Sequence, residues 1–259
     1  MIKKYESAYY NINTILIKGA MFDIDITGQE TESVSGRIET SDADFILVPE
    51  QKGGTLQITF KKPLWKPPIF KVHDLVLKVP HSVRIKIENT SGKVTVNRIQ
   101  TAPVISTTSG DITISEITSG NGISLNTTSG DIKAGDINAS INTRTTSGEH
   151  LYENIEGSIM AIATSGEMNI NTHKGTLSLT STSGRKTGKN ITLTGDSIFK
   201  STSGNIDMDL INPHAEFTFN LRATTGELQT GDQKGKRELS TGSGKITITG
   251  MSTTGNQSY

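Results

Sequence analysis

The chain has 259 residues, enough for one large domain or two small ones with a buried core. Its 26 basic and 26 acidic side chains balance, which argues against a nucleic-acid partner, because such affinity depends on Lys and Arg neutralising phosphates. The absence of cysteine excludes disulfides, thiolate zinc sites and thiol catalysis, and 26 glycines together with frequent Ser and Thr favour many turns and strands.

The N-terminus carries Lys3 and Lys4 but no apolar run of seven or more residues behind them. The sequence therefore predicts no secretory signal and a cytoplasmic location. A cell-surface location is the alternative, if the chain is a trimmed mature form. No stretch approaches 18 apolar residues, so no transmembrane segment is expected.

Residues 1–84 hold five of the seven prolines but still alternate like strands, as in residues 22–26 and 55–60. We expect an N-terminal β cap with lead-in strands, because the end of a stack of strands exposes unpaired edges. The proline-rich run 61–71 is expected to protrude as a loop. Its Trp65, flanked by Lys62 and Lys66, is the best candidate for contact with a partner, a glycan or a membrane surface. In the alternative, Trp65 folds back and plugs the end of the stack.

A Ser-Gly or Thr-Gly pair recurs through the rest of the chain at intervals of 18 to 22 residues. The nine pairs start at Ser91, Ser109, Ser129, Ser147, Ser165, Ser183, Ser203, Thr225 and Ser243. In most repeats, apolar residues take the positions two and four after the Gly and four before the pair, as Ile112, Ile114 and Ile105 do for Ser109. Alternation around each Gly has period two, which indicates strands.

A coil of about 20 residues cannot bury its own apolar side chains, so coils must stack on one another. We therefore predict an all-β fold, a single-stranded β-solenoid (β-helix) of about nine or more coils with an 18–22-residue period and an N-terminal β cap. Residues 85–259 form the solenoid repeats, continuous with the cap at 1–84. The longer intervals should place extra residues in loops near 119–122, 195–196 and 212–214.

The coil that begins at Ser183 departs from the pattern, because Lys186 and Gly188 take positions that are apolar in its neighbours. A buried unpaired lysine is costly. We expect a locally bulged or frayed coil there.

The segment 75–80, the segment 85–96 and the repeated Thr-Thr-Ser-Gly-Asp-Ile together resemble the bacterial "putative adhesin" family of domains of unknown function. The resemblance covers most of the chain. It implies a β-helical fold, often on secreted or membrane-linked bacterial proteins, with no established activity and no catalytic residues to carry over.

The residues that directly follow the Gly of successive repeats form one column of the predicted stack. Four consecutive members of this column are carboxylates: Asp111, Asp131, Glu149 and Glu167. Stacked on adjacent strands, their oxygens suit a hard cation such as calcium, but a solvated acidic stripe is the simpler interpretation, so no metal site is assigned. His150 falls on an inward column and is interpreted as a core imidazole held by a neighbour, with Tyr152 in the same coil. The threonines before the Ser-Gly pairs are interpreted as corner residues and not as an ice-binding array.

The leading functional hypothesis is a non-enzymatic scaffold or binding module of unknown ligand, adhesin-like, with a protein or glycan partner and no cofactor. A β-helix enzyme acting on acidic polysaccharide is the first alternative, although it needs converging carboxylates and stacking aromatics. Self-association through the solenoid ends into filaments is the second, and it requires an uncapped C-terminal coil around residues 245–249.

Overall fold

In the computed structural model, the described residues are 3–19, 21–40, 46–61 and 73–259. They confirm the predicted all-β class: apart from one short 3-10 helix, every described element is a strand. None of the described residues belongs to a helix long and apolar enough to cross a bilayer. Trp65, Lys62 and Lys66 lie outside the described residues, so their role stays a prediction.

The chain forms two compact units, residues 1–130 and 131–259, and the predicted division at 84/85 stays a prediction. The first unit contains β1 (Lys3–Tyr10), β2 (Thr14–Lys18), β3 (Asp23–Gln29), β4 (Ser33–Thr40), β5 (Ile46–Lys52), β6 (Thr55–Lys61), β7 (His73–Pro80), β8 (Arg84–Glu88), β9 (Val94–Ile99), β10 (Val104–Ser106), β11 (Ile112–Thr118) and β12 (Ile123–Asn126).

The second unit contains β13 (Ile132–Asn138), β14 (Ile141–Ser147), β15 (His150–Glu156), β16 (Ile159–Ser165), β17 (Met168–Gly175), β18 (Leu177–Ser183), β19 (Lys186–Leu193), β20 (Ser197–Ser203), β21 (Ile206–Leu210), η1 (His214–Glu216), β22 (Phe217–Thr230), β23 (Gln233–Gly242), β24 (Ile246–Thr254) and β25 (Gln257–Ser258). The extra residues near 119–122, 195–196 and 212–214 fall between strands, as predicted.

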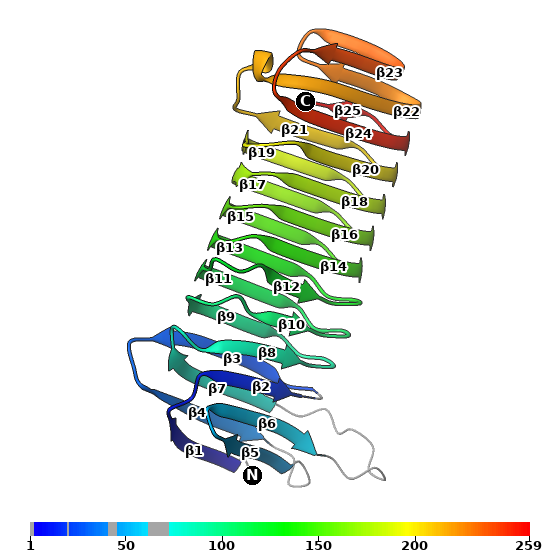
Figure 1. Ribbon diagram of the computed structural model, residues 1–259. Helices are drawn as coiled ribbons and strands as arrows, with labels where there is room; N and C mark the ends of the chain where they lie inside the picture. The colour runs from blue at the N-terminus through cyan, green and yellow to red at the C-terminus, as the bar shows by residue number, and fades with distance from the viewer. Residues whose placement is uncertain (1–2, 20, 41–45, 62–72) are drawn as a thin grey trace. The chain divides into compact units, whose positions relative to one another are not determined.

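In the first unit, strands from the N-terminal segment interleave with those of the repeats (Figure 1). β2 lies parallel between β6 and β8, and β3 lies parallel between β7 and β9. Beyond them, β5 pairs antiparallel with β6, and β4 pairs antiparallel with β7 and β1. The lead-in strands therefore share hydrogen-bonded layers with the first repeats.

The second unit has two layers of parallel strands, visible as two series in Figure 1. We call β14, β16, β18, β20, β24 and the first half of β22 the even layer, paired in that order. We call β13, β15, β17, β19, β21 and β25 the odd layer. The repeat sets the register, as in Ile141 opposite Ile159 and Ile159 opposite Leu177.

The last coil does not follow sequence order. β24 lies between β20 and β22, while β23 folds back antiparallel on β22. Ser203 and Thr225 both face Thr254, so the corner of this coil is Thr254-Gly255. The ninth Ser-Gly pair of the sequence, Ser243-Gly244, does not form this corner, because it lies between β23 and β24, so the expectation that each pair begins a coil is wrong at this position. The repeat pattern predicts the strands of a coil. It does not predict which strands pair, because strands from different positions in the sequence can form the same hydrogen bonds.

This threading also corrects the expected C-terminal edge. Residues 246–249 are paired on β22, and β24 as a whole is paired on both sides, so residues 245–249 do not form an open coil. β23 occupies the outer position in its place. It carries exposed Lys234, Lys236 and Arg237, and charged side chains on an edge strand oppose pairing with another chain.

The Ser-Gly corners recur because stacked corners approach too closely for a side chain. Gly166 has φ 134°, and a Cβ there would lie 2.0 Å from the carbonyl oxygen of Gly148. Gly184 repeats the arrangement one coil further, 1.9 Å from the carbonyl oxygen of Gly166. Any larger residue would push the coils apart at this point. The interval between successive corner glycines in the sequence therefore equals the length of one coil.

A second corner escaped sequence analysis because glycine does not mark it. Six residues after the Gly of successive repeats, a residue other than glycine adopts the left-handed region, for example Asp136, Asn154, Thr172 and Asn190 at φ 53–58°. Asn and Asp tolerate this conformation, whereas threonine does so at a cost. The mixture of residue types hides the position in the sequence.

The coil at Ser183 is neither frayed nor bulged toward its preceding neighbour. β19 pairs in register with β17 from Lys186 to Leu193, and Lys186 is fully buried. The irregularity lies on the other side, in the pairing with β21. Gly188 pairs with Met208 and Ile191 with Leu210, so β19 has one residue more than β21 between these two pairs. The expected bulge is therefore present, but the lysine remains inside the core.

Candidate functional site

The outward surface of the even layer is built from a regular alternation of side chains. In β16, Ile159, Ala161 and Ala163 are buried, so the residues between them point outward. The same alternation holds in β14, β18 and β20, and because the strands are in register, outward residues of one strand lie beside those of the next. We call this outward surface the threonine face.

Three rows of side chains run across the threonine face from strand to strand. The first row is Asn142, Met160, Ser178, Ile198, Thr249 and Asn220. The second is Arg144, Ile162, Thr180, Lys200, Met251 and Arg222. The third, beside the corner, is Thr146, Thr164, Thr182, Thr202, Thr253 and Thr224. Members of a row are separated by one strand spacing, about 4.8 Å.

A shallow groove of about 610 Å³ crosses this face. Thr182, Thr202 and Thr253 line one side of it, and Lys200 and Arg222 line it from the second row. The small residues of the inward column between these rows, such as Ser181, form its floor. The groove therefore offers hydroxyl groups and cations together.

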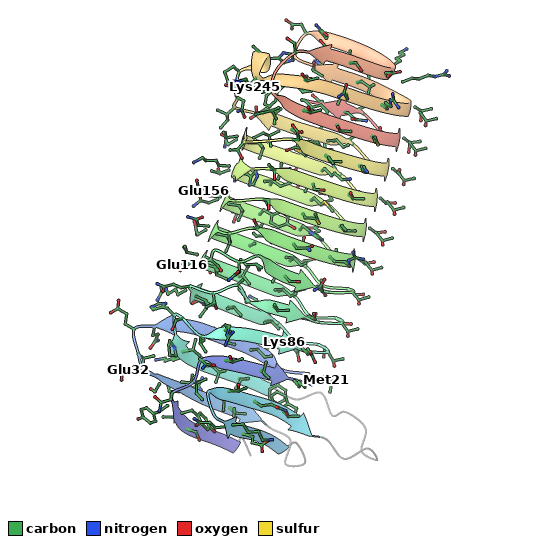
Figure 2. The ribbon with its side chains drawn as sticks, viewed as in Figure 1. Met21, Glu32, Lys86, Glu116, Glu156 and Lys245 are labelled. Carbon is green, nitrogen blue, oxygen red and sulfur yellow. The ribbon has the colours of Figure 1, made fainter. Side chains whose placement is uncertain are left out.

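Charge is distributed unevenly over the second unit. The outward positions of the even layer carry Arg144, Lys200 and Arg222 and no carboxylate. The odd layer does carry outward acids, among them Glu156, which projects from the side of the ribbon in Figure 2. Arg222 has one acidic neighbour, Glu238 on β23, with its Nη2 3.3 Å from Oε1. This exposed pair is weak, because water screens it.

A buried cation lies behind the floor of the groove. Lys186 comes from β19 in the odd layer and crosses the interior, where its Nζ donates a hydrogen bond to Ser181 Oγ. Burial lowers the pKa of Lys186 from 10.5 to about 8, so the ammonium still predominates at neutral pH. The hydroxyl of Ser201, one strand from Ser181, is buried and has no hydrogen-bond partner within the described chain. The interior beneath the groove is thus polar and positive.

A second polar cluster is sealed within the same unit. His150 Nδ1 lies 2.9 Å from the Tyr152 hydroxyl and 3.1 Å from Thr143 Oγ1, and the two oxygens also contact each other. Burial lowers the pKa of His150 to about 4 and raises the pKa of Tyr152. His150 is fully buried, which confirms the interpretation of a core imidazole held by a neighbour in its own coil.

One carboxylate of the acidic column, Asp131, has a structural role. Asp131 Oδ1 accepts a hydrogen bond from the backbone N–H of Glu149 at 2.9 Å, in the next coil. Asn205 does the same for the N–H of Asn256, and Asp23 for that of Lys93, at 3.0 and 2.7 Å. These side chains satisfy amides where the chain turns between strands.

The column is split between the units: Asp111 belongs to the first, and Asp131, Glu149 and Glu167 belong to the second. Among the residues that the structure describes, no group of three or more His, Asp or Glu side chains converges to hold a metal ion. The interpretation of the column as a solvated acidic stripe stays a prediction, and calcium titration tests it against the cation-binding alternative.

The stacked parallel strands, inward apolar columns and glycine corners define an all-β solenoid. The chain belongs to the family described as Toastrack DUF4097, whose model matches residues 12–255. This supports the resemblance to bacterial adhesin-like proteins of unknown function. No curated protein matches the sequence.

Two solved structures show the same fold at low sequence identity. A "putative adhesin" from Bacteroides fragilis is 16% identical over 81% of this chain and 97% of its own, with a TM-score of 0.53. A "putative lipid binding protein" from Parabacteroides distasonis is 12% identical over 99% of this chain and 96% of its own, with a TM-score of 0.51. At these identities the likeness concerns the fold alone.

Proposed function

We propose that the chain is a non-enzymatic binding module that holds an extended ligand along the threonine face. The observation that carries this proposal is the alignment of the three outward rows across six parallel strands. A rigid surface that repeats at each strand spacing suits a ligand that also repeats, because each unit of the ligand meets a similar set of groups. The groove along these rows gives the ligand a defined path.

The placement of reactive and aromatic groups favours binding over catalysis. His150, Tyr152 and Lys186 are among the groups with strongly shifted pKa values, and all three are fully buried and inaccessible to a polymer. The aromatic side chains Phe199 and Phe219 pack inside the solenoid, and neither is available to stack on a sugar in the groove. A polysaccharide-cleaving enzyme needs acid–base groups beside its substrate.

Binding to an array of immobilised neutral and acidic polysaccharides, with blocked variants, tests the proposal. Thr202→Tyr places a large side chain in the groove. The control, Asn171→Tyr, introduces the same side chain at an exposed position of β17 in the odd layer. We expect Thr202→Tyr to weaken binding at least tenfold and Asn171→Tyr to bind as the unsubstituted protein does. Equal binding by the two variants would show that the threonine face is not the site.

The same polysaccharides test for catalysis. We expect neither new reducing ends nor unsaturated products after prolonged incubation, and their appearance would replace the binding module with the β-helix enzyme. Cell fractionation then distinguishes the cytoplasmic location predicted from the N-terminus from the cell-surface location that an adhesive role requires.

A further inference from the structure

We propose that the groove on the threonine face selects an acidic polysaccharide, with Lys200 and Arg222 pairing its carboxylates or sulfates while the threonine row binds its hydroxyls. This inference rests on the proposed function and adds the chemical class of the ligand.

The spacing of Lys200 and Arg222 matches the spacing of charges along an acidic polysaccharide. Lys200 and Arg222 occupy the second row on either side of Met251, so they are two strand spacings apart, about 10 Å. An extended polysaccharide that carries one acid on every second sugar presents its charges at a similar interval. Met251 between them is 42% exposed and offers an apolar contact for the intervening sugar.

Free hydroxyls lie beside these cations on the same three strands. Thr202, Thr253 and Thr224 are exposed, and their side chains make no hydrogen bond within the described chain. A threonine hydroxyl both donates and accepts, as sugar hydroxyls do. The neighbouring Thr254 and Thr225 donate to backbone carbonyls at 3.3 Å, so the corner is already stabilised without the third row.

The charge behind the groove also favours an anion. The Lys186 ammonium is bound to Ser181, which forms part of the floor, and it lies in a buried region where electrostatic interactions are screened less than in water. The outward positions of the even layer contribute no carboxylate to oppose it. Lys200 and Arg222 on the outer side of this layer and Lys186 on its inner side therefore all attract an anion in the groove, and the exposed pair of Arg222 with Glu238 offsets them weakly.

The groove suits a sugar polymer better than a nucleic acid. Proteins that bind single-stranded nucleic acids combine a basic groove with aromatic side chains on which bases stack. Here Phe199, Phe217 and Phe219 are buried, and the groove presents threonine and methionine. The net charge of the chain is zero, so attraction of anions is local to this face.

Titration with hyaluronan oligosaccharides, and with the same oligosaccharides after methyl esterification of their carboxylates, tests the inference. The esters keep the sugar chain and remove its charge. We expect the acidic form to bind at least fivefold more tightly at low salt, and the difference to shrink as salt rises because exposed ion pairs are screened. Equal affinity for acid and ester would overturn the charge assignment and leave the proposed function standing.

Variants locate the effect. Lys200→Met should lower affinity for the acidic form about threefold to fivefold with little change for the ester. Lys189→Met, on exposed β19 of the odd layer, is the matched control and should leave both affinities unchanged. Circular dichroism checks that each variant is folded. A loss of affinity in Lys189→Met equal to that in Lys200→Met, or matched binding of single-stranded DNA, would overturn the inference, whereas unchanged binding in Thr202→Tyr would remove the proposed function itself.

Discussion

Replacing the buried lysine by methionine should stabilise the protein. Lys186 lies in register between Met168 and Ile206, so methionine continues an apolar column. Burial lowers the pKa of Lys186 from 10.5 to about 8. The difference corresponds to about 3 kcal/mol of folding free energy lost to the buried ammonium. Leaving the Ser181 hydroxyl without its partner returns about 1 kcal/mol of this, so we expect a net gain of about 2 kcal/mol at pH 7.

The gain should depend on pH in a defined window. Below pH 8 the lysine is charged in both the folded and the unfolded chain, and the folded chain bears the full cost. Between pH 8 and 10.5 the folded chain releases the proton while the unfolded chain keeps it, so the stability of the unsubstituted protein rises with pH. The advantage of Lys186→Met should therefore shrink across this window.

Urea denaturation at pH 7 and at pH 10.5, followed by circular dichroism, measures both effects. Lys189→Met is the control, since Lys189 is exposed on the same strand and its replacement should change stability by less than about 0.5 kcal/mol. A Lys186→Met variant less stable than the unsubstituted protein at pH 7 would refute the reasoning. So would a gain that stays constant from pH 7 to 10.5, because the cost would then not come from the charge.

Three further changes test other parts of the fold. Burial lowers the pKa of His173 on β17 from 6.5 to about 4, so between pH 6.5 and 4 the unfolded chain binds a proton that the folded chain does not, and the protein loses stability as pH falls. His173→Ile should recover about 3 kcal/mol at pH 4, measured by melting temperature, and identical acid sensitivity in the variant would contradict this. Gly166→Ala, whose Cβ would lie 2.0 Å from the Gly148 carbonyl oxygen, should cost more than about 2 kcal/mol in urea denaturation, whereas Gly135→Ala, with its nearest contact at 3.9 Å, should be tolerated, and equal costs would disprove the close-approach argument. Lys236→Val on the outer strand β23 should raise light scattering with protein concentration, and a variant that stays as monodisperse as the unsubstituted protein would show that charge does not protect this edge.

The regular part of the fold was predictable because the reasons for it are local and repeat. A glycine is needed wherever stacked corners approach closely, as at Gly166 and Gly184, and period-two alternation marks which side chains point inward. From these signals the all-β class, the burial of the columns and the positions of the extra loops follow. The candidate site was not predicted, since its threonines were interpreted as corner residues alone.

The tertiary structure decided which strands pair with one another, which a repeated sequence pattern leaves open. Coils with the same pattern can pair with any neighbour of that pattern, so only the folded chain shows that β2 lies between β6 and β8 and that β24 lies between β20 and β22. That threading brings Met251 between Lys200 and Arg222, residues that lie far apart in the sequence, and so creates the groove's arrangement of charge. The burial of Lys186 was likewise decided by its neighbours. Lys186 pairs in register with Met168 and Ile206, whose side chains are buried, so its own side chain points into the core as well.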